Sequence, residues 1–209
     1  MSKELIIFDM DGTLVDSSLT IARAINHVRK NLSLDPMDEH YILDQVNNPN
    51  INAALHFYEA SEFTQEHEIW FSGYYAKNHE EELKLYDGIK ELLLTLKTKG
   101  FKLAVATNAY KVSTLQSLGH LQILELFDGI ACYDEVKNGK PHPDMLKKLL
   151  NELNIDISNA IFIGDGERDQ LAAEAIEMDY FMVNWGFSDH EENVIHTVNE
   201  LNKKILEIQ

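Results

Sequence analysis

The sequence predicts an α/β fold in which residues 1–15 and 84–209 form a doubly wound parallel β-sheet and residues 16–83 form an all-helical insert. Three observations predict it. Short apolar runs of strand length alternate with amphipathic stretches of helical length along most of the chain. The insert interrupts this alternation, because it is rich in His, Asn, Glu and aromatic residues and has no convincing β-branched strand. Polar residues also follow several predicted strands, at the edge where open α/β sheets bind ligands.

The predicted strands are apolar runs that suit a sheet covered on both faces. The first is expected at residues 5–8, which are all apolar. Further runs predict strands at 101–107, 127–132, 160–164 and 180–183. Strands separated by helices at this spacing are typical of a parallel sheet with helices on both faces.

Helices are predicted between these strands and throughout the insert. Asp87 is a candidate N-cap for a helix that ends near Gly100, and Pro143 suits the first turn of another helix. Further helices of the α/β part are expected at 110–118, 171–176 and 194–208. The insert is expected to be helical at 17–30 and roughly at 38–46, 50–60 and 64–80.

The composition limits the compartment in which the chain would work. With 209 residues, 44% of them apolar, the chain can bury a sizeable core. No apolar run approaches the ~20 residues that span a bilayer, and no secretory signal is evident at the start, so we expect no membrane insertion. Cys132 is the only cysteine, which excludes an internal disulfide and a cysteine-based zinc site and fits a reducing cytoplasm.

The formal net charge of −17 limits the partners. Such a charge disfavours nucleic acid and anionic membranes as partners, because both are themselves negative. An anionic substrate would also be repelled. A bound divalent cation would be the simplest remedy.

Two aspartates stand where the first predicted strand ends. Because side chains alternate along an extended chain, Asp9 and Asp11 would lie on the same side, and Gly12 lets the backbone turn just beyond them. Two carboxylates held this close repel each other, which implies a metal, a proton shuttle or both. A calcium loop of the EF-hand type is disfavoured, because its Gly and Glu positions hold Leu14 and Thr20.

Other predicted strands also end in polar residues. Thr107 and Asn108 end the second strand, Asp165 follows the fourth, Asp169 comes one turn later, and a turn-rich loop presents Lys140. Carboxylate oxygens suit Mg²⁺. A free carboxylate can act as a nucleophile, a second can act as an acid and base, and an ammonium and a hydroxyl can hold phosphoryl oxygens. The set therefore favours phosphoryl transfer.

These residues resemble the motifs of the haloacid dehalogenase superfamily, in its phosphatase branch. Four motifs occur in the family's order, and the similarity covers the whole chain: Asp9-Met10-Asp11-Gly12-Thr13, Thr107-Asn108, Gly139-Lys140-Pro141 and Gly164-Asp165-Gly166-Glu167-Arg168-Asp169. The helical insert resembles the cap of phosphoglycolate-phosphatase-like members. The resemblance implies a Rossmann-like core and a cap at residues 16–83.

The resemblance also implies roles for the acidic residues. Asp9 would be the nucleophile, which forms a phospho-aspartyl intermediate, and Asp11 the general acid and base. Mg²⁺ would be held by the Asp9 carboxylate, the main-chain carbonyl of Asp11 and Asp165, with Asp169 at or just outside the ligand sphere. The implied enzyme is a Mg²⁺-dependent phosphatase.

The substrate side of the site is implied in the same way. Thr107 and Lys140 would hold the phosphoryl oxygens, and Asn108 would contribute to substrate binding. The partner would be a small phosphorylated metabolite, such as a phosphoglycolate-like acid, a sugar phosphate or a nucleotide. The protein would act as a monomer or a homodimer.

Two other functions remain open. A phosphomutase of the β-phosphoglucomutase type uses the same core residues. A non-catalytic phospho-accepting or phosphate-binding module would combine similar groups, as receiver domains do. Metal-free dehalogenation is disfavoured, because Asp11 is the phosphatase choice at the acid/base position.

The cap loop Val46–Asn50 is where the resemblance is weakest. The corresponding loop in relatives contacts the leaving group and often contains glycine, whereas this one has none. Asn47, Asn48 and Asn50 would either bond a polar leaving group or serve as turn formers, and for any one of them turn formation is the favoured interpretation.

Overall fold

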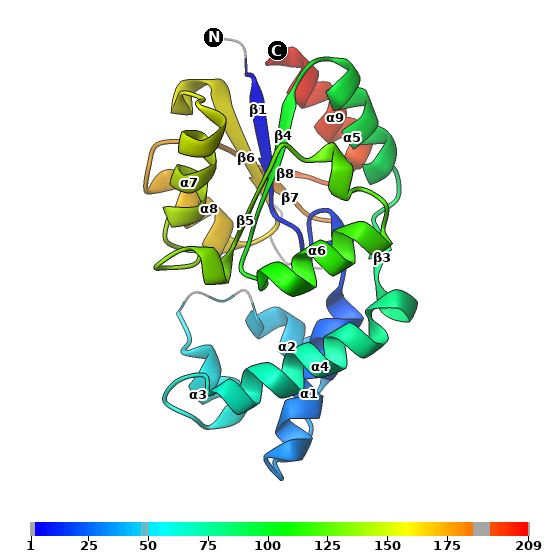
Figure 1. Cartoon of the computed structure of the whole chain (residues 1–209), viewed down its shortest axis with the longest axis vertical. Helices are drawn as coiled ribbons and strands as arrows, with labels where there is room; N and C mark the ends of the chain where they lie inside the picture. Colours follow the sequence, from blue (N-terminus) through cyan, green and yellow to red (C-terminus); the bar gives the residue numbers. More distant parts are fainter. Residues whose placement is uncertain (1–2, 47, 49, 186–192, 209) are drawn as a thin grey trace. The chain divides into compact units, whose positions relative to one another are not determined.

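The structure is a computed structural model that describes residues 3–46, 48, 50–185 and 193–208. The chain divides into two compact units. We call them the α/β unit, Met1–Asp16 with Lys84–Gln209, and the helical unit, Ser17–Leu83 (Figure 1). Among the described residues, no helix combines the length and the apolar character that crossing a membrane requires.

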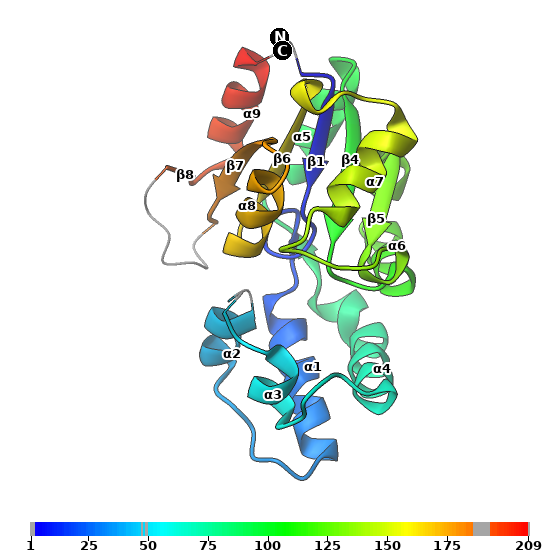
Figure 2. The ribbon, with the colours of Figure 1, turned by 90° about the vertical axis from the view of Figure 1, so that its left-hand side faces the viewer.

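The α/β unit is built on a six-stranded sheet in the order β5-β4-β1-β6-β7-β8, which Figure 2 shows nearly face-on. Every pair of neighbouring strands is parallel. The strands are β1 Leu5–Phe8, β4 Lys102–Thr107, β5 Gly129–Cys132, β6 Ala160–Gly164, β7 Asp179–Val183 and β8 Val194–Ile195. The predicted fold class is therefore confirmed.

Helices cover both faces of this sheet, as predicted for a doubly wound fold. Figure 1 shows α5 (Ile89–Thr98) and α9 (Val198–Glu207) on one side and α7 (Asp144–Leu153) and α8 (Glu167–Glu174) on the other. α6 (Lys111–His120) follows β4. β1 and β6 are buried at every position, because both faces of each strand meet a helical layer.

Several predicted element boundaries differ from the structure; for example, the helix predicted at 171–176 is α8, Glu167–Glu174. Three further differences have a local structural reason. The helix predicted at 194–208 is wrong at its start, because Val194 and Ile195 form β8 and α9 begins at Val198. Two residues carry no periodicity, and they form a strand only by pairing with β7. The third strand begins at Gly129 rather than at 127, after a 3-10 turn at Leu124–Leu126. The N-cap of α5 is Gly88 rather than Asp87, since the backbone there has φ of 85°.

A short antiparallel pair was not predicted. β2 (Val15–Asp16) pairs with β3 (Lys84–Leu85), so the two segments that lead into and out of the helical unit are joined by backbone hydrogen bonds. Each strand has only two residues, which is too short for a sequence pattern to indicate.

The described residues of the helical unit form four helices and no strand. The helices are α1 Ser18–Asn31, α2 Glu39–Val46, α3 Ala53–Tyr58 and α4 Gln65–Glu82. They enclose a small apolar core of their own, to which α1 contributes three residues, α2 one and α3 two: Ala22, Ile25, Val28, Ile42, Phe57 and Tyr58.

Arg29 is buried in this unit and holds two of its segments. Its Nε donates to the Asp35 carbonyl at 2.7 Å and its Nη1 to the Phe57 carbonyl at 2.5 Å. We expect Arg29→Met, which keeps most of the apolar stem, to lower the free energy of unfolding by about 1–3 kcal/mol, because the buried Phe57 carbonyl loses its donor. Urea unfolding would measure this change. Lys30→Met at the exposed neighbouring position is the control and should stay within about 0.5 kcal/mol of the unaltered protein; equal midpoints for the two variants would contradict the prediction.

Candidate active site

The predicted site residues emerge at one edge of the sheet. β1 lies between β4 and β6 and runs parallel to both. Asp9 therefore follows the central strand, while Thr107 ends one neighbour and Asp165 follows the other. Asp9 and Thr107 are buried, and Asp165 is partly exposed. This is the carboxyl edge of the sheet, where the sequence predicts ligand binding.

The turn after β1 brings its backbone against Asp165. Gly12 has φ of 87°, and its N–H donates to the Val15 carbonyl at 2.9 Å. A Cβ atom placed on Gly12 would lie 2.2 Å from Asp165 Oδ2, so the close approach requires glycine. The Thr13 hydroxyl donates to Asp165 Oδ1 at 3.2 Å. The first motif thus helps to position the carboxylate of the fourth.

Three carboxylates meet beyond these strand ends. Asp9, Asp165 and Asp169 each offer an oxygen, and these oxygens all lie within 4.8 Å of one another. Asp169 is buried in the first turn of α8, where its Oδ2 accepts the Gly166 N–H at 3.2 Å. A Cβ on Gly164 would lie 2.6 Å from Asp169, so a second glycine permits this approach.

Lys140 points into the carboxylate cluster. Its Nζ contacts Asp9 Oδ1 and lies 2.6 Å from Asp169 Oδ1, and it stands 5.6 Å from the centre of the Phe162 ring. Burial by itself lowers the pKa of Lys140, but the carboxylates of Asp169 and Asp9 outweigh it and raise the pKa above its usual value. The lysine is therefore a buried cation.

The carboxylates carry more negative charge than this lysine balances. Burial raises the pKa of Asp9 well above its usual value, even though Lys140 opposes this, and the neighbouring carboxylates of Asp169, Asp165 and Asp11 raise it further. Burial, with Asp169 beside it, raises the pKa of Asp165 to about 7. Asp9 and Asp165 thus hold their protons more strongly than ordinary aspartates do. A set of hard oxygen donors with excess negative charge fits a cation such as Mg²⁺.

The end of β4 contributes a hydroxyl and an amide. The buried Thr107 side chain accepts the Ala109 N–H at 3.0 Å through Oγ1. Asn108 bonds to the backbone of Lys140 through both ends of its amide, at 2.8 Å and 3.0 Å. The structure therefore brings Thr107, Asn108 and Lys140 to the same edge, whereas their predicted contacts with substrate stay predictions.

Asp11 lies in the turn that follows Asp9. It is partly buried and forms a backbone bridge with Val15. Its predicted acid and base role and its carbonyl as a metal ligand stay predictions. In the predicted cap loop, Asn48 accepts the Asn50 N–H at 2.9 Å, which is local turn bonding, while residues 47 and 49 lie outside the described residues.

Some residues around the site were missed by sequence reasoning. The Trp185 indole donates to the Thr13 carbonyl at 2.9 Å, from 172 positions away in the chain. The Tyr180 hydroxyl lies 3.4 Å from the Gly166 carbonyl. The sequence could have indicated Thr13, because it belongs to the first motif. No sequence pattern indicated Trp185 or Tyr180, since only the order of the strands brings them close to Thr13 and Gly166.

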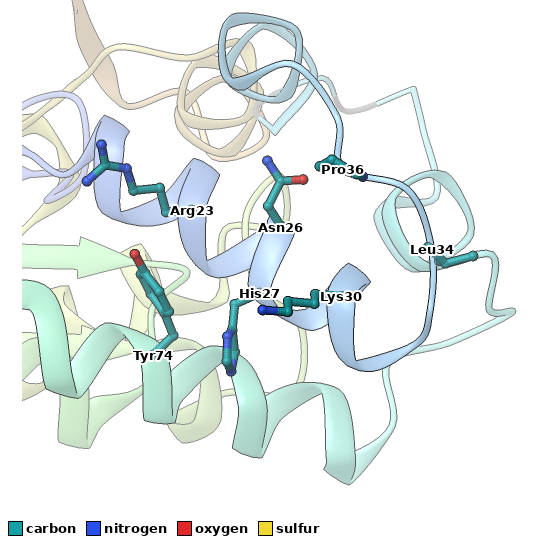
Figure 3. Close-up of a pocket in the computed structure, with 7 residues that line it drawn as sticks. All are labelled: Arg23, Asn26, His27, Lys30, Leu34, Pro36 and Tyr74. Atoms are coloured by element: carbon teal, nitrogen blue, oxygen red, sulfur yellow. The ribbon is translucent and has the colours of Figure 1, made fainter.

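A separate cavity of about 410 Å³ lies within the helical unit and includes none of the predicted site residues. Figure 3 shows its lining from α1, from α4 and from the segment after α1: Arg23, Asn26, His27, Lys30, Leu34, Pro36 and Tyr74. Arg23 is paired with Glu82 at 2.8 Å and with Glu39 at 3.5 Å, so its charge is already balanced.

Known proteins resemble this chain over nearly its whole length. The family described as haloacid dehalogenase-like hydrolases matches residues 6–183. A phosphoglycolate phosphatase from Colwellia psychrerythraea is 33% identical over 199 residues, which cover 91% of this chain and 88% of that protein. A phosphoglycolate phosphatase from Aquifex aeolicus is 32% identical over 186 residues, which cover 88% and 85%. A solved structure of a predicted phosphatase from Clostridium acetobutylicum has a TM-score of 0.86 at 30% identity, with 99% of this chain and 100% of that chain covered.

Proposed function

The chain belongs to the haloacid dehalogenase-like hydrolase family, and from this premise we propose that it is a Mg²⁺-dependent phosphatase that acts through a phospho-aspartyl intermediate. The observation that carries the proposal is the cluster of Asp9, Asp165 and Asp169 with the Lys140 ammonium among them. Three carboxylates and one ammonium leave an excess of two negative charges when all are ionised. A divalent cation held by Asp9, Asp165, the Asp11 carbonyl and Asp169 would balance that excess and attract the phosphate anion.

Asp9 is the proposed nucleophile. It is buried and directly follows β1, a fully buried strand inside the sheet, so a strand rather than a long loop positions its carboxylate. One carboxylate oxygen would attack phosphorus and release the alcohol, which leaves the phosphoryl group on Asp9. Water would then displace the carboxylate, which regenerates Asp9 and frees phosphate.

Asp11 is the proposed acid and base. Its position two residues after Asp9, in the turn beyond β1, keeps it near the nucleophile and leaves it less buried than Asp9. It would donate a proton to the leaving oxygen in the first step. In the second step it would accept a proton from the attacking water.

Lys140 and Thr107 are proposed to hold the transferring group. The Lys140 ammonium touches Asp9, so it lies beside the oxygens that a phosphoryl group on that carboxylate would carry. The Thr107 hydroxyl ends the neighbouring strand at the same edge. Fixed donors of this kind stabilise the charge that develops on the phosphoryl oxygens.

We assign the helical unit the role of a cap that excludes water during transfer. The proposed substrate is a small phosphate monoester in the cytoplasm. 2-Phosphoglycolate is the first candidate, because relatives that cover most of this chain are named after it.

Metal removal tests the proposal. Phosphate release from 2-phosphoglycolate, sugar phosphates, nucleotides and an aryl phosphate is expected to fall to background in EDTA and to return with excess Mg²⁺. Mg²⁺ should also raise the melting temperature, because it binds the folded cluster and not the unfolded chain. Unchanged turnover in EDTA would refute the metal requirement. Conversion of a sugar phosphate to its isomer without free phosphate would indicate a mutase, and one stoichiometric phosphorylation a non-catalytic module.

A further inference from the structure

The Asn108 side chain joins the end of β4 to a loop 32 residues further along the chain. Its Oδ1 accepts the Lys140 N–H at 2.8 Å, and its Nδ2 donates to the Lys140 carbonyl at 3.0 Å. Both hydrogen bonds are of normal length and engage the same residue. Together they restrain the position and the orientation of the Lys140 backbone.

The residues before Lys140 permit the contact between Asn108 and the Lys140 backbone. A Cβ on Gly139 would lie 2.6 Å from Asn108 Oδ1, so a side chain at position 139 would push the amide away. On the other side of Gly139, the Asn138 N–H and Nδ2 both donate to Asp144 Oδ2 at 3.1 Å. The loop that carries Lys140 is thus held on both sides of this glycine.

The restraint matters because the Lys140 ammonium must reach one position, between two buried carboxylates. Its Nζ is buried between Asp9 and Asp169, and the side chain reaches that point from the restrained backbone. We infer that Asn108 is a positioning residue, which acts on the reaction through Lys140 and not by its own contact with the phosphoryl group. This inference rests on the proposed function, in which Lys140 holds the phosphoryl oxygens.

Chemical labelling of Lys140 tests the restraint without any activity assay. The folded protein is treated with an amine-acylating reagent, and acylation of Lys140 is followed by mass spectrometry. Asn108→Ala should raise the labelling rate of Lys140 roughly tenfold, because a less restrained loop exposes the amine more often.

The chain offers a matched control. Asn26 in the helical unit bonds to the Met37 backbone through the same pair of contacts, at 2.8 Å and 2.9 Å. Asn26→Ala therefore removes an equivalent pair of hydrogen bonds and should leave Lys140 labelling unchanged. Equal labelling in both variants, at whatever level, would overturn the inference.

Kinetics separate positioning from direct binding. Asn108→Ala should lower kcat/KM on the order of 10- to 100-fold, as loss of a group that orients another does. In a Lys140→Arg background, which keeps a cation in the buried site, the same change should cost less than about twofold, since the two residues act as one unit. If the loss of kcat/KM in the double variant equals the product of the losses in Asn108→Ala and Lys140→Arg, the two residues act independently. Asn108 would then contact the phosphoryl group itself, and the inference would be wrong. If the unaltered protein releases no phosphate, the proposed function fails, and labelling alone then decides whether Asn108 restrains Lys140.

Discussion

Asp9→Asn is expected to lower turnover of a small aryl phosphate on the order of 10⁴-fold or more. The amide keeps the size of the carboxylate but cannot form the phospho-aspartyl bond, and losing a nucleophile removes most of the catalysis that an enzyme provides. Steady-state phosphate release measures the loss. Acid-quenched protein from the unaltered chain should carry phosphate on Asp9, and the variant should carry none.

The fold should survive this change. Burial raises the pKa of Asp9, which means that the ionised carboxylate costs stability in the metal-free protein, and a neutral amide removes that cost. Lys140 keeps Asp169 as a partner. We therefore expect a melting temperature in EDTA no lower than that of the unaltered chain, and a smaller increase on adding Mg²⁺.

Asp128→Asn is the matched control for Asp9→Asn. Asp128 also pairs with a lysine, Lys97, at 2.8 Å, and it accepts the N–H of Leu103 in β4 at 2.8 Å, remote from the cluster. The turnover of the Asp128→Asn variant should stay within about twofold of that of the unaltered protein. Full turnover in the Asp9 variant would end the proposed mechanism, whereas equal losses in both variants would indicate a general effect on folding.

Gly12→Ala is expected to lower kcat/KM on the order of 100-fold and to raise the Mg²⁺ concentration needed for half-maximal activity. The new methyl group would lie 2.2 Å from Asp165 Oδ2 and 2.5 Å from its Cγ, so either the turn or the carboxylate must move. Displacing a site group by about 1 Å can cost a factor of this size. A Mg²⁺ titration of turnover, with melting temperatures at each concentration, measures both effects.

The control for Gly12→Ala must place an alanine in the same left-handed backbone conformation at a site where its methyl group meets no other atom. Gly100 has φ of 91°, close to the 87° of Gly12, and a Cβ there meets nothing within 4 Å. Gly100→Ala should therefore lose only about 1 kcal/mol of stability from the left-handed conformation and keep its turnover and Mg²⁺ requirement. Normal turnover and Mg²⁺ requirement in Gly12→Ala would show that Asp165 is not held by this approach.

Sequence patterns predicted the strands that carry enough apolar residues to show a pattern. The run at 160–164 matches β6 at both ends, and the run at 5–8 matches β1, because both are buried on two faces and bounded by polar residues. β2, β3 and β8 have two residues each, and they exist only because a neighbour pairs with them. Local pattern cannot indicate such elements.

The sequence by itself determined the chemical types in the site and their places at strand ends: carboxylates after the first and fourth predicted strands, a hydroxyl after the second and a lysine in a loop. Only the tertiary structure decided which of them touch. Lys140 contacts Asp9, 131 positions away in the chain, and Thr13 contacts Asp165, 152 positions away. Both contacts depend on strand order and register. Side-chain alternation and apolar runs are local properties, whereas the Asn108 contact with Lys140 and the approach of Gly12 to Asp165 arise only when distant strands pair.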